Sequence, residues 1–191
     1  LSKTITKNLN KDEKKSNGIY FTSQEIIKKT IKMLGKRRFK RILEPCYGSG
    51  EFIKELSNKY KKSRIEGIEM NEMMTGLCEK NEDMKGENIE LKRGDYLKTD
   101  FEEVYDLIIG NPPFYVMKRG DVEKDYLKYI EGRPNIFVLF ILKSLSLLKK
   151  RGILSFVLPS SFKNCLYYNK LRELIDKTCE IIGIEDNEGA K

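Results

Sequence analysis

The tetrapeptide Asn111-Pro112-Pro113-Phe114 combines residue types that could do chemistry at the end of a strand. It directly follows the apolar run from Asp106 to Ile109, which predicts a buried strand. The two prolines fix φ and remove two N–H donors, so the backbone carbonyls are held outward in a rigid arrangement. An amide precedes these carbonyls and an aromatic ring follows them. The combination indicates a functional loop rather than an ordinary turn.

A glycine turn follows an earlier apolar run, in the stretch 42–50. Gly48 and Gly50 would let the backbone turn tightly and approach a ligand, with the N–H groups of the next helix facing it. A glycine pair after a strand also closes ordinary turns, so both interpretations stay open for the glycines alone. Glu69 ends the next apolar run, about 20 residues further on, where a carboxylate can accept hydrogen bonds from both ribose hydroxyls. Together these features favour a nucleoside cofactor.

Asp95 and Tyr96 follow the third apolar run. The carboxylate could accept a hydrogen bond from an exocyclic amine while the tyrosine covers a ring face. Taken by itself, Asp95 is better explained as a turn residue.

Short apolar runs alternate with amphipathic stretches, which is typical of βαβ units around a mainly parallel sheet. The expected strands are 41–44, 65–69, 89–92, 106–109, 153–158 and 180–185. The expected helices are 23–34, 50–60, 72–81, 136–148 and 168–177. Residues 115–133 form a charged connection that is long enough to be functional or disordered. The sequence therefore predicts an α/β fold with the motifs at strand ends.

The amino-acid composition excludes several kinds of catalytic and metal site. The 191 residues include no His, which excludes His-based catalysis and His–metal sites, and four Cys without a C-x-x-C pair, which argues against disulfides and a zinc site. The net charge of +8 is compatible with a polyanionic partner or with compositional bias. The longest apolar run, 136–142, is too short to cross a bilayer, and no apolar signal segment precedes it. We therefore expect a cytoplasmic protein that contacts no membrane.

The order of these motifs resembles the catalytic domain of the γ-class N6-adenine DNA methyltransferases of restriction-modification systems. The family's segment ahead of the first strand is matched by 17–23, with Ser23 in place of a proline. The family's Asp-Pro-x-x-Gly-x-Gly-x-Phe is matched by 44–52, with Glu44 in place of the aspartate. Glu69, Asp95 and the Asn-Pro-Pro-Phe block follow in the family's order, and 135–162 resembles its later blocks. The resemblance covers nearly the whole chain from Gly18 onward.

The resemblance implies a Rossmann-like fold, a mainly parallel sheet flanked by helices, that transfers a methyl group from S-adenosylmethionine to the N6 amine of a flipped-out adenine in DNA. The side-chain oxygen of Asn111 and the carbonyl of Pro112 would accept hydrogen bonds from the two N6 hydrogens. No metal is required. Phe114 and Tyr168, whose neighbour Tyr167 is also aromatic, would stack on the extruded base. The implied cofactor residues are Thr22, Glu44, Pro45, Gly48, Gly50, Glu69, Asp95 and Tyr96.

Three alternatives stay open: an RNA base N-methyltransferase, a protein glutamine N5-methyltransferase, and an inactive nucleic-acid-binding module on the same fold. We expect residues 1–17 to form a flexible basic arm and residues 18–191 to form the catalytic domain. That domain would lack its last antiparallel strand and any target-recognition domain. Recognition, or an endonuclease, would then reside on a separate domain or chain.

Overall fold

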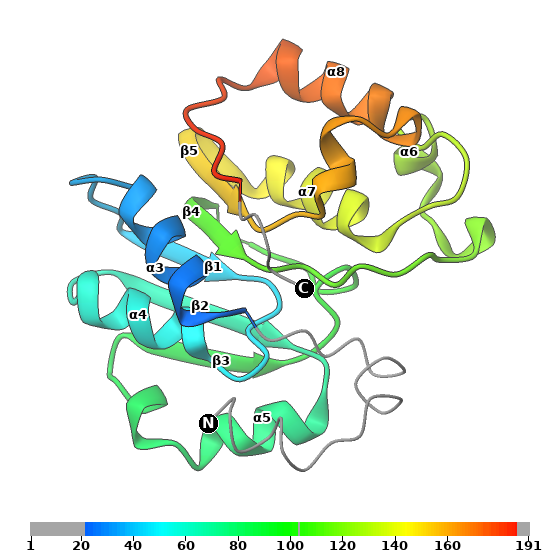
Figure 1. Cartoon of the computed structure of the whole chain (residues 1–191). Helices are drawn as coiled ribbons and strands as arrows, with labels where there is room; N and C mark the ends of the chain where they lie inside the picture. Colours follow the sequence, from blue (N-terminus) through cyan, green and yellow to red (C-terminus); the bar gives the residue numbers. More distant parts are fainter. Residues whose placement is uncertain (1–21, 103, 187–191) are drawn as a thin grey trace.

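The computed structural model describes residues 22–102 and 104–186 (Figure 1). The predicted basic arm at 1–17, and with it most of the motif at 17–23, lies outside the described residues. Within the described part, no helix is both long and apolar enough to cross a membrane.

The centre of the fold is a parallel sheet with the strand order β3-β2-β1-β4-β5. Its strands are β1 (Arg41–Glu44), β2 (Arg64–Glu69), β3 (Ile89–Arg93), β4 (Tyr105–Gly110) and β5 (Leu148–Phe156). In register, Ile42 of β1 lies beside Ile65 of β2 and Leu107 of β4, and all three side chains are fully buried. The predicted α/β fold class and parallel sheet are therefore confirmed.

Helices and short 3-10 turns connect the strands and cover the sheet (Figure 1). The helices are α3 (Gln24–Met33), α4 (Glu51–Lys59), α5 (Glu72–Glu79), α6 (Lys124–Leu127), α7 (Ile136–Leu147) and α8 (Asn169–Thr178). The 3-10 turns are η1 (Glu82–Met84), η2 (Arg119–Asp121), η3 (Ser160–Lys163) and η4 (Leu166–Tyr168). The side chain of Ser23 caps α3 by accepting a hydrogen bond from the Ile26 N–H, at 3.3 Å, which is why the helix begins there.

Helix α7 is apolar on almost every side, and it is buried along most of its length. This is the pattern of a helix enclosed by protein on all faces. Phe137 packs against Phe162 of η3 and Tyr168 of η4, whereas Phe140 packs against Tyr96 with ring centroids 5.0 Å apart. The helix therefore ties the sheet to the C-terminal elements.

The charged connection at 115–133 is an ordered element of the core. It contains η2 and α6, and it buries Val122 and Ile130 in the same apolar cluster as α7. An antiparallel bridge between Val116 and Asn135 closes it into a loop beside the Asn-Pro-Pro-Phe block. Its cations Lys118, Arg119, Lys124, Lys128 and Arg133 all remain exposed.

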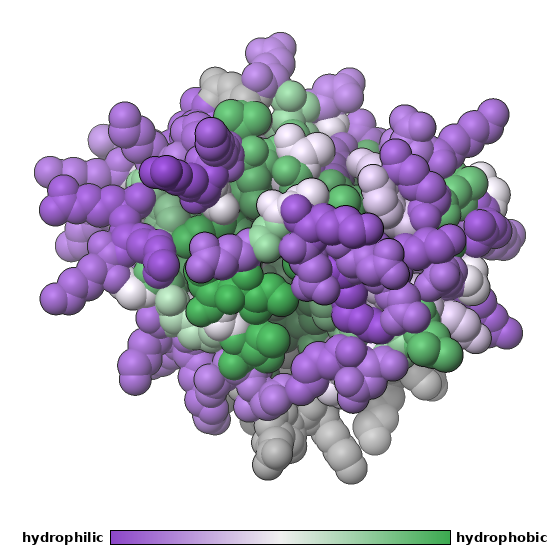
Figure 2. Space-filling model, turned by 90° about the horizontal axis from the view of Figure 1, so that it is seen from above, coloured by the Kyte–Doolittle hydropathy of each residue, from purple (hydrophilic) through white to green (hydrophobic). Residues whose placement is uncertain are grey.

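The predicted strand at 180–185 is wrong. Residues 179–186 have no regular secondary structure and leave Ile181, Ile182 and Ile184 more than half exposed. The segment reaches α3 and η3 through ion pairs of Glu185 with Lys29 and of Asp186 with Lys163. A strand requires a neighbouring strand to satisfy its N–H and C=O groups, and no described strand lies in register with this segment. Figure 2, which views the α8 side, shows apolar residues in the middle of this otherwise hydrophilic face.

Candidate active site

The predicted motifs that follow β1, β2, β3 and β4 lie at one edge of the sheet, because the strands are parallel. The strand order reverses direction between β1 and β4. From β1 the chain adds β2 and β3 on one side of the sheet, and it then crosses back to add β4 and β5 on the other side of β1. The loops after two such strands diverge and leave a crevice at their carboxyl ends, where α/β sheets bind ligands. Glu44 ends β1 and Asn111 follows β4, so both lie at this point.

The glycines after β1 adopt the conformations that the motif requires. Gly48 has φ 51° and Gly50 has φ 77°, both in the left-handed region. A Cβ on Gly50 would lie 2.8 Å from the sulfur of Met84, whereas a Cβ on Gly48 would meet no atom within 4 Å. The turn is therefore packed at Gly50 and open at Gly48, which leaves room for a ligand next to the Gly48 backbone.

Glu69 fastens this turn to the end of β2. Its Oε2 accepts a hydrogen bond from the Gly48 N–H at 2.9 Å, and its Oε1 accepts one from the Asn71 N–H at 2.7 Å. A carboxylate has about four acceptor positions, so two remain for other donors. Glu69 is thus a rigid acceptor beside the glycine turn, and its contact with a ribose stays a prediction.

Asp95 and Tyr96 occupy different environments. Asp95 is partly exposed after β3, where its Oδ1 accepts a hydrogen bond from the Leu97 N–H at 3.0 Å. The Tyr96 side chain is 2% exposed, and its hydroxyl shares a hydrogen bond of 2.9 Å with Ser144 of α7. Burial raises the pKa of the Tyr96 hydroxyl. Core packing alone explains Tyr96, and its contact with a cofactor stays a prediction that these contacts do not favour.

Glu44 is a buried carboxylate at the end of β1. It is 2% exposed, and its Oε2 has no hydrogen-bond partner among the described residues. Burial first, and then the nearby charge of Glu69, raise the pKa of the Glu44 carboxyl well above its ordinary value. Such an atom is costly to leave unpaired, so Glu44 can accept a hydrogen bond from a donor that the described residues do not supply.

The Cys46 thiol forms a hydrogen bond between the loop after β1 and the loop after β4. Its Sγ donates to the backbone oxygen of Asn111 at 3.3 Å. Burial, reinforced by Glu44 and Glu69, raises the pKa of the Cys46 thiol well above its ordinary value. Because the thiolate is the nucleophilic form, this environment opposes covalent catalysis by Cys46.

Asn111 is the most specifically oriented side chain at this edge. Its Nδ2 donates to the hydroxyl oxygen of Thr22 at 3.0 Å, across 89 residues of sequence. Its Oδ1 is buried and has no partner in the part of the chain that the structure describes. The contact with Thr22 thus holds the amide so that its oxygen is available. Sequence reasoning placed Thr22 with the cofactor and did not foresee this contact, for which the sequence offers no signal.

The other residues of the tetrapeptide form the wall beside Asn111. Pro112 is buried and Pro113 is half-buried, as is Phe114, whose ring meets Phe137 edge-on with centroids 6.1 Å apart. Pro45 follows Glu44 directly and lies beside Gly110, where an added Cβ would meet it at 3.6 Å. The loops after β1 and β4 are therefore in contact with each other.

The two adjacent tyrosines of η4 differ sharply in exposure. Tyr168 is 9% exposed and packs on Phe137 and Phe162, with ring centroids 5.0 and 5.8 Å apart. Tyr167 is 53% exposed and lies against Gly132, where a Cβ would come within 2.8 Å of its ring. The predicted stacking of Tyr168 on a base remains untested, and the exposed aromatic face in this turn belongs to Tyr167.

Comparisons with known proteins find relatives among methyltransferases. A family model described as Eco57I restriction-modification methylase matches residues 13–191. The type II methyltransferase M.CvrRI of Paramecium bursaria Chlorella virus XZ-6E is 33% identical over 177 residues, which cover 92% of this chain and 45% of that protein. The modification methylase CviBIII of Paramecium bursaria Chlorella virus NC1A is 32% identical, over 94% of this chain and 47% of that protein. The chain thus spans about half the length of these relatives.

Solved structures share the fold at lower identity. A protein of Listeria monocytogenes described as a class I S-adenosylmethionine-dependent methyltransferase aligns with a TM-score of 0.71 and 19% identity, over 84% of this chain and 53% of that one. The N-methyltransferase NodS of Bradyrhizobium japonicum aligns with a TM-score of 0.53 and 16% identity, over 81% of this chain and 80% of that one. Identities this low establish the architecture only.

Proposed function

Because the chain belongs to the Eco57I restriction-modification methylase family, we propose that it carries the catalytic site of an enzyme that methylates the N6 amine of a flipped-out adenine in DNA. The observation that supports this most strongly is the buried Oδ1 of Asn111, which accepts no hydrogen bond in the described part of the chain. An amine hydrogen is the donor that this oxygen lacks.

The chemistry of the amine explains why acceptors are needed. The lone pair of adenine N6 is delocalised into the ring, so the nitrogen is a weak nucleophile. The Asn111 side-chain oxygen and the Pro112 carbonyl accept the two N6 hydrogens and concentrate electron density on the nitrogen as it attacks. Because Thr22 already holds the Asn111 amide, little reorganisation is needed during the reaction.

The residues at the carboxyl edge fit S-adenosylmethionine, which when bound supplies an electrophilic methyl group on a good leaving group. The unpartnered Oε2 of Glu44 is a buried acceptor for the cationic ammonium of the methionine portion. The free acceptor positions of Glu69 suit ribose hydroxyls, and Asp95 suits the adenine amine. Gly48 leaves space for the ligand between them.

The extruded base needs an aromatic surface beside Asn111. Phe114 follows the prolines directly and is only half-buried, so it provides one such surface. Tyr168 provides the other if its ring can leave the apolar cluster, whereas Tyr167 is already exposed. The five exposed cations of 115–133 lie in the same loop as Phe114 and would contact the DNA phosphates.

The test is methyl transfer from labelled S-adenosylmethionine to DNA, RNA and protein substrates offered separately, with digestion of the product to identify the modified atom. We expect label on adenine N6 in DNA, and incorporation that is slower by about 10² or more with the Asn111→Ala variant. Label on RNA, or on glutamine amides, would replace the proposed substrate by one of the two enzyme alternatives. Cofactor binding without transfer to any substrate would favour the inactive module.

A further inference from the structure

A second pocket lies at the opposite edge of the sheet, where the strands begin. The loop between α3 and β1 forms one side, and the first part of β5, where its pairing with β4 shifts register, forms the other. The pocket has a volume of about 260 Å³ and is lined by Arg37, Arg38, Phe39, Asp106, Lys150, Arg151, Gly152 and Ile153. Asp106 lies near the start of β4 and Asn111 directly follows its end, so about 16 Å of extended chain separates this pocket from the Asn111 amide.

The cations of this pocket form no ion pair with the residues that the structure describes. Within 22–102 and 104–186, Arg38, Lys150 and Arg151 form no hydrogen bond or ion pair through their side chains. Arg37 donates only to the backbone oxygen of Leu34, at 3.4 Å. The four side chains come from segments that are more than a hundred residues apart in the sequence, yet they surround one cavity.

Asp106, which provides the pocket's carboxylate, is already occupied by other groups. Its Oδ2 accepts hydrogen bonds from the Lys40 and Arg41 N–H groups, both at 2.8 Å, and its Oδ1 accepts one from Lys149 at 3.1 Å. It therefore fastens the start of β1 to the start of β5 and contributes little to balancing the four cations.

The backbone of β5 at Arg151 is strained and closely packed. Arg151 has φ 66°, the only non-glycine residue with a positive φ in the described part of the chain. A Cβ on the next residue, Gly152, would lie 2.9 Å from the Lys149 oxygen and 3.1 Å from the Tyr105 oxygen, so this segment is packed tightly on β4. Glycine or asparagine would adopt this φ more easily than arginine. The strain is explained if the arginine side chain is needed at this position.

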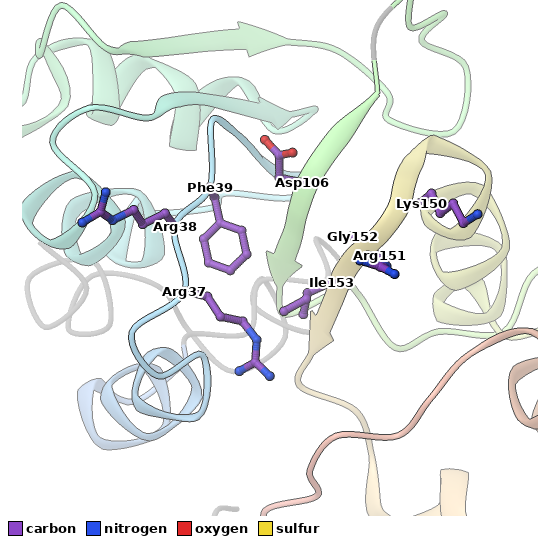
Figure 3. Close-up of a pocket in the computed structure, with 8 residues that line it drawn as sticks. All are labelled: Arg37, Arg38, Phe39, Asp106, Lys150, Arg151, Gly152 and Ile153. Atoms are coloured by element: carbon purple, nitrogen blue, oxygen red, sulfur yellow. The ribbon is translucent and has the colours of Figure 1, made fainter.

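Figure 3 shows how the lining residues are arranged. Phe39 and Ile153 lie in the middle, Arg38 extends to one side, and Lys150 and Arg151 extend to the other, with their charged ends directed away from the middle. A phosphate bound here therefore requires these exposed side chains to turn inwards. Phe39 is 8% exposed and is held edge-on against Tyr60 at 5.3 Å between ring centroids. The pocket thus has a fixed apolar floor and a basic rim.

We propose that this pocket binds a phosphate group of a polynucleotide backbone, as a contact separate from the active site. Its volume lies below the roughly 300–1,000 Å³ of small-molecule pockets, which fits a single phosphate better than a whole nucleotide. Guanidinium groups bind phosphate oxygens through paired hydrogen bonds. The choice of a polynucleotide over a free anion rests on the proposed function. Because the two edges face opposite ways, the pocket holds a segment of DNA other than the one that enters the active site.

The test compares the salt dependence of binding to a mixed-sequence DNA duplex, measured by fluorescence anisotropy on the full chain. The pocket variant is Arg38→Gln/Arg151→Gln, and the matched control is Lys28→Gln/Lys80→Gln, which removes two exposed charges elsewhere. Each lost phosphate contact lowers the log–log salt slope by about 0.9, so we expect the pocket variant, which loses one bound phosphate, to lose about 0.9 and the control to lose none. Equal slopes for the two variants would overturn the proposal.

A second variant guards against a folding defect. Arg151→Gly suits φ 66°, so its thermal midpoint should equal or exceed that of the wild type while its salt slope falls, by at most about 0.9. An unchanged slope at an unchanged or higher midpoint would also overturn the proposal.

Inorganic phosphate distinguishes the two sources of the anion. If it shifts the Gly152 amide resonance while the pocket and control variants bind duplex alike, the pocket takes a free anion and the polynucleotide proposal fails. Methyl transfer is measured in parallel. If the pocket and control variants have equal salt slopes while the wild type methylates DNA, the pocket proposal alone fails. If their slopes differ as expected while the wild type does not methylate DNA, the proposed function alone fails.

Discussion

Two buried side-chain oxygens at the crevice between β1 and β4 have no hydrogen-bond partner among the described residues: Glu44 Oε2 and Asn111 Oδ1. An unsatisfied buried acceptor costs about 1–3 kcal/mol, so a pair of them at one site is a substantial cost to the free protein. One is charged when ionised and suits a cation, whereas the other is neutral and suits an amine. Binding and catalysis can therefore be separated by substitution.

Asn111→Ala should affect the chemical step and spare the cofactor. We expect kcat and kcat/KM for DNA methylation to fall together by about 10² or more, because the acceptor acts on the attacking amine in the transition state. Calorimetry should show nearly unchanged affinity for S-adenosylmethionine. Methylation at close to the wild-type rate would contradict the mechanism.

Thr22 should behave as a positioning residue for Asn111. Thr22→Val removes the acceptor at 3.0 Å from Asn111 Nδ2 and leaves that donor without this partner. The penalty of about 1–3 kcal/mol corresponds to a loss of roughly 5- to 150-fold in kcat if it falls on the orientation of the amide. Thr22→Ser keeps the hydroxyl and should restore most of the rate. If Thr22→Val instead weakens cofactor binding at unchanged kcat, its role is the cofactor contact that the family resemblance implies.

Glu44 should make the stability of the free protein fall as pH rises. Its pKa is raised in the folded state, so from the ordinary pKa of about 4.5 upward the folded chain binds more protons than the unfolded one. Stability is then fully present below that pH and is lost as pH rises towards the folded pKa. Glu44→Gln should flatten this dependence, raise the thermal midpoint at neutral pH and weaken cofactor binding. Thermal melts across pH 4–8 in roughly unit steps would reveal it, and a pH dependence that persists in the variant would refute the assignment.

At the scale of elements, the sequence predicted β1 to β4 and α3 to α5 to within two residues at each end, because apolar periodicity and capping residues determine them locally. β5 begins at Leu148, well before the predicted Ile153, because the basic residues up to Arg151 interrupt the apolar run that indicates a strand. The error at 180–185 has a different cause. Alternating isoleucines indicate a strand, but pairing depends on a neighbour that local sequence does not specify.

Side-chain partners were less predictable than elements. Tyr167 and Tyr168 are identical in type and adjacent, and only the packing of η4 on α7 decides which one is buried. Thr22 and Asn111 meet across 89 residues, which no spacing rule could indicate. The glycine turn and Glu69 were predictable because each ends a strand of a parallel sheet, and the topology brings those ends together.

The contact between Tyr96 and Ser144 should stabilise the attachment of α7 to the sheet and leave the cofactor unaffected. Ser144→Ala leaves the buried Tyr96 hydroxyl without this hydrogen-bond partner, so the free energy of unfolding measured with denaturant should fall by about 1–3 kcal/mol. Adding Tyr96→Phe removes both partners, so the double variant should be more stable than Ser144→Ala alone. Calorimetry on Tyr96→Phe should show unchanged cofactor affinity. A tenfold loss of affinity would place Tyr96 in the cofactor site after all.

At the scale of the whole molecule, two opposing features control self-association. The net charge of +8 makes copies repel one another, whereas β5 pairs only with β4 among the described strands and the 179–186 segment exposes apolar side chains. An unpaired edge strand next to exposed isoleucines favours contact between copies. Salt should decide between these effects, because the Debye length falls from about 10 Å at 0.1 M to about 3 Å at 1 M while apolar contact is not screened.

We therefore expect the chain, free of DNA, to associate more at high than at low salt in sedimentation velocity experiments. Ile182→Lys/Ile184→Lys should reduce that association, since both side chains are more than half exposed in the 179–186 segment. Met73→Lys is the control, because Met73 is also exposed, at 42%, but lies on α5. The opposite salt dependence, with association lost as salt rises, would mean that charge attraction holds the copies together. The open edge of β5 would then have no part in the contact.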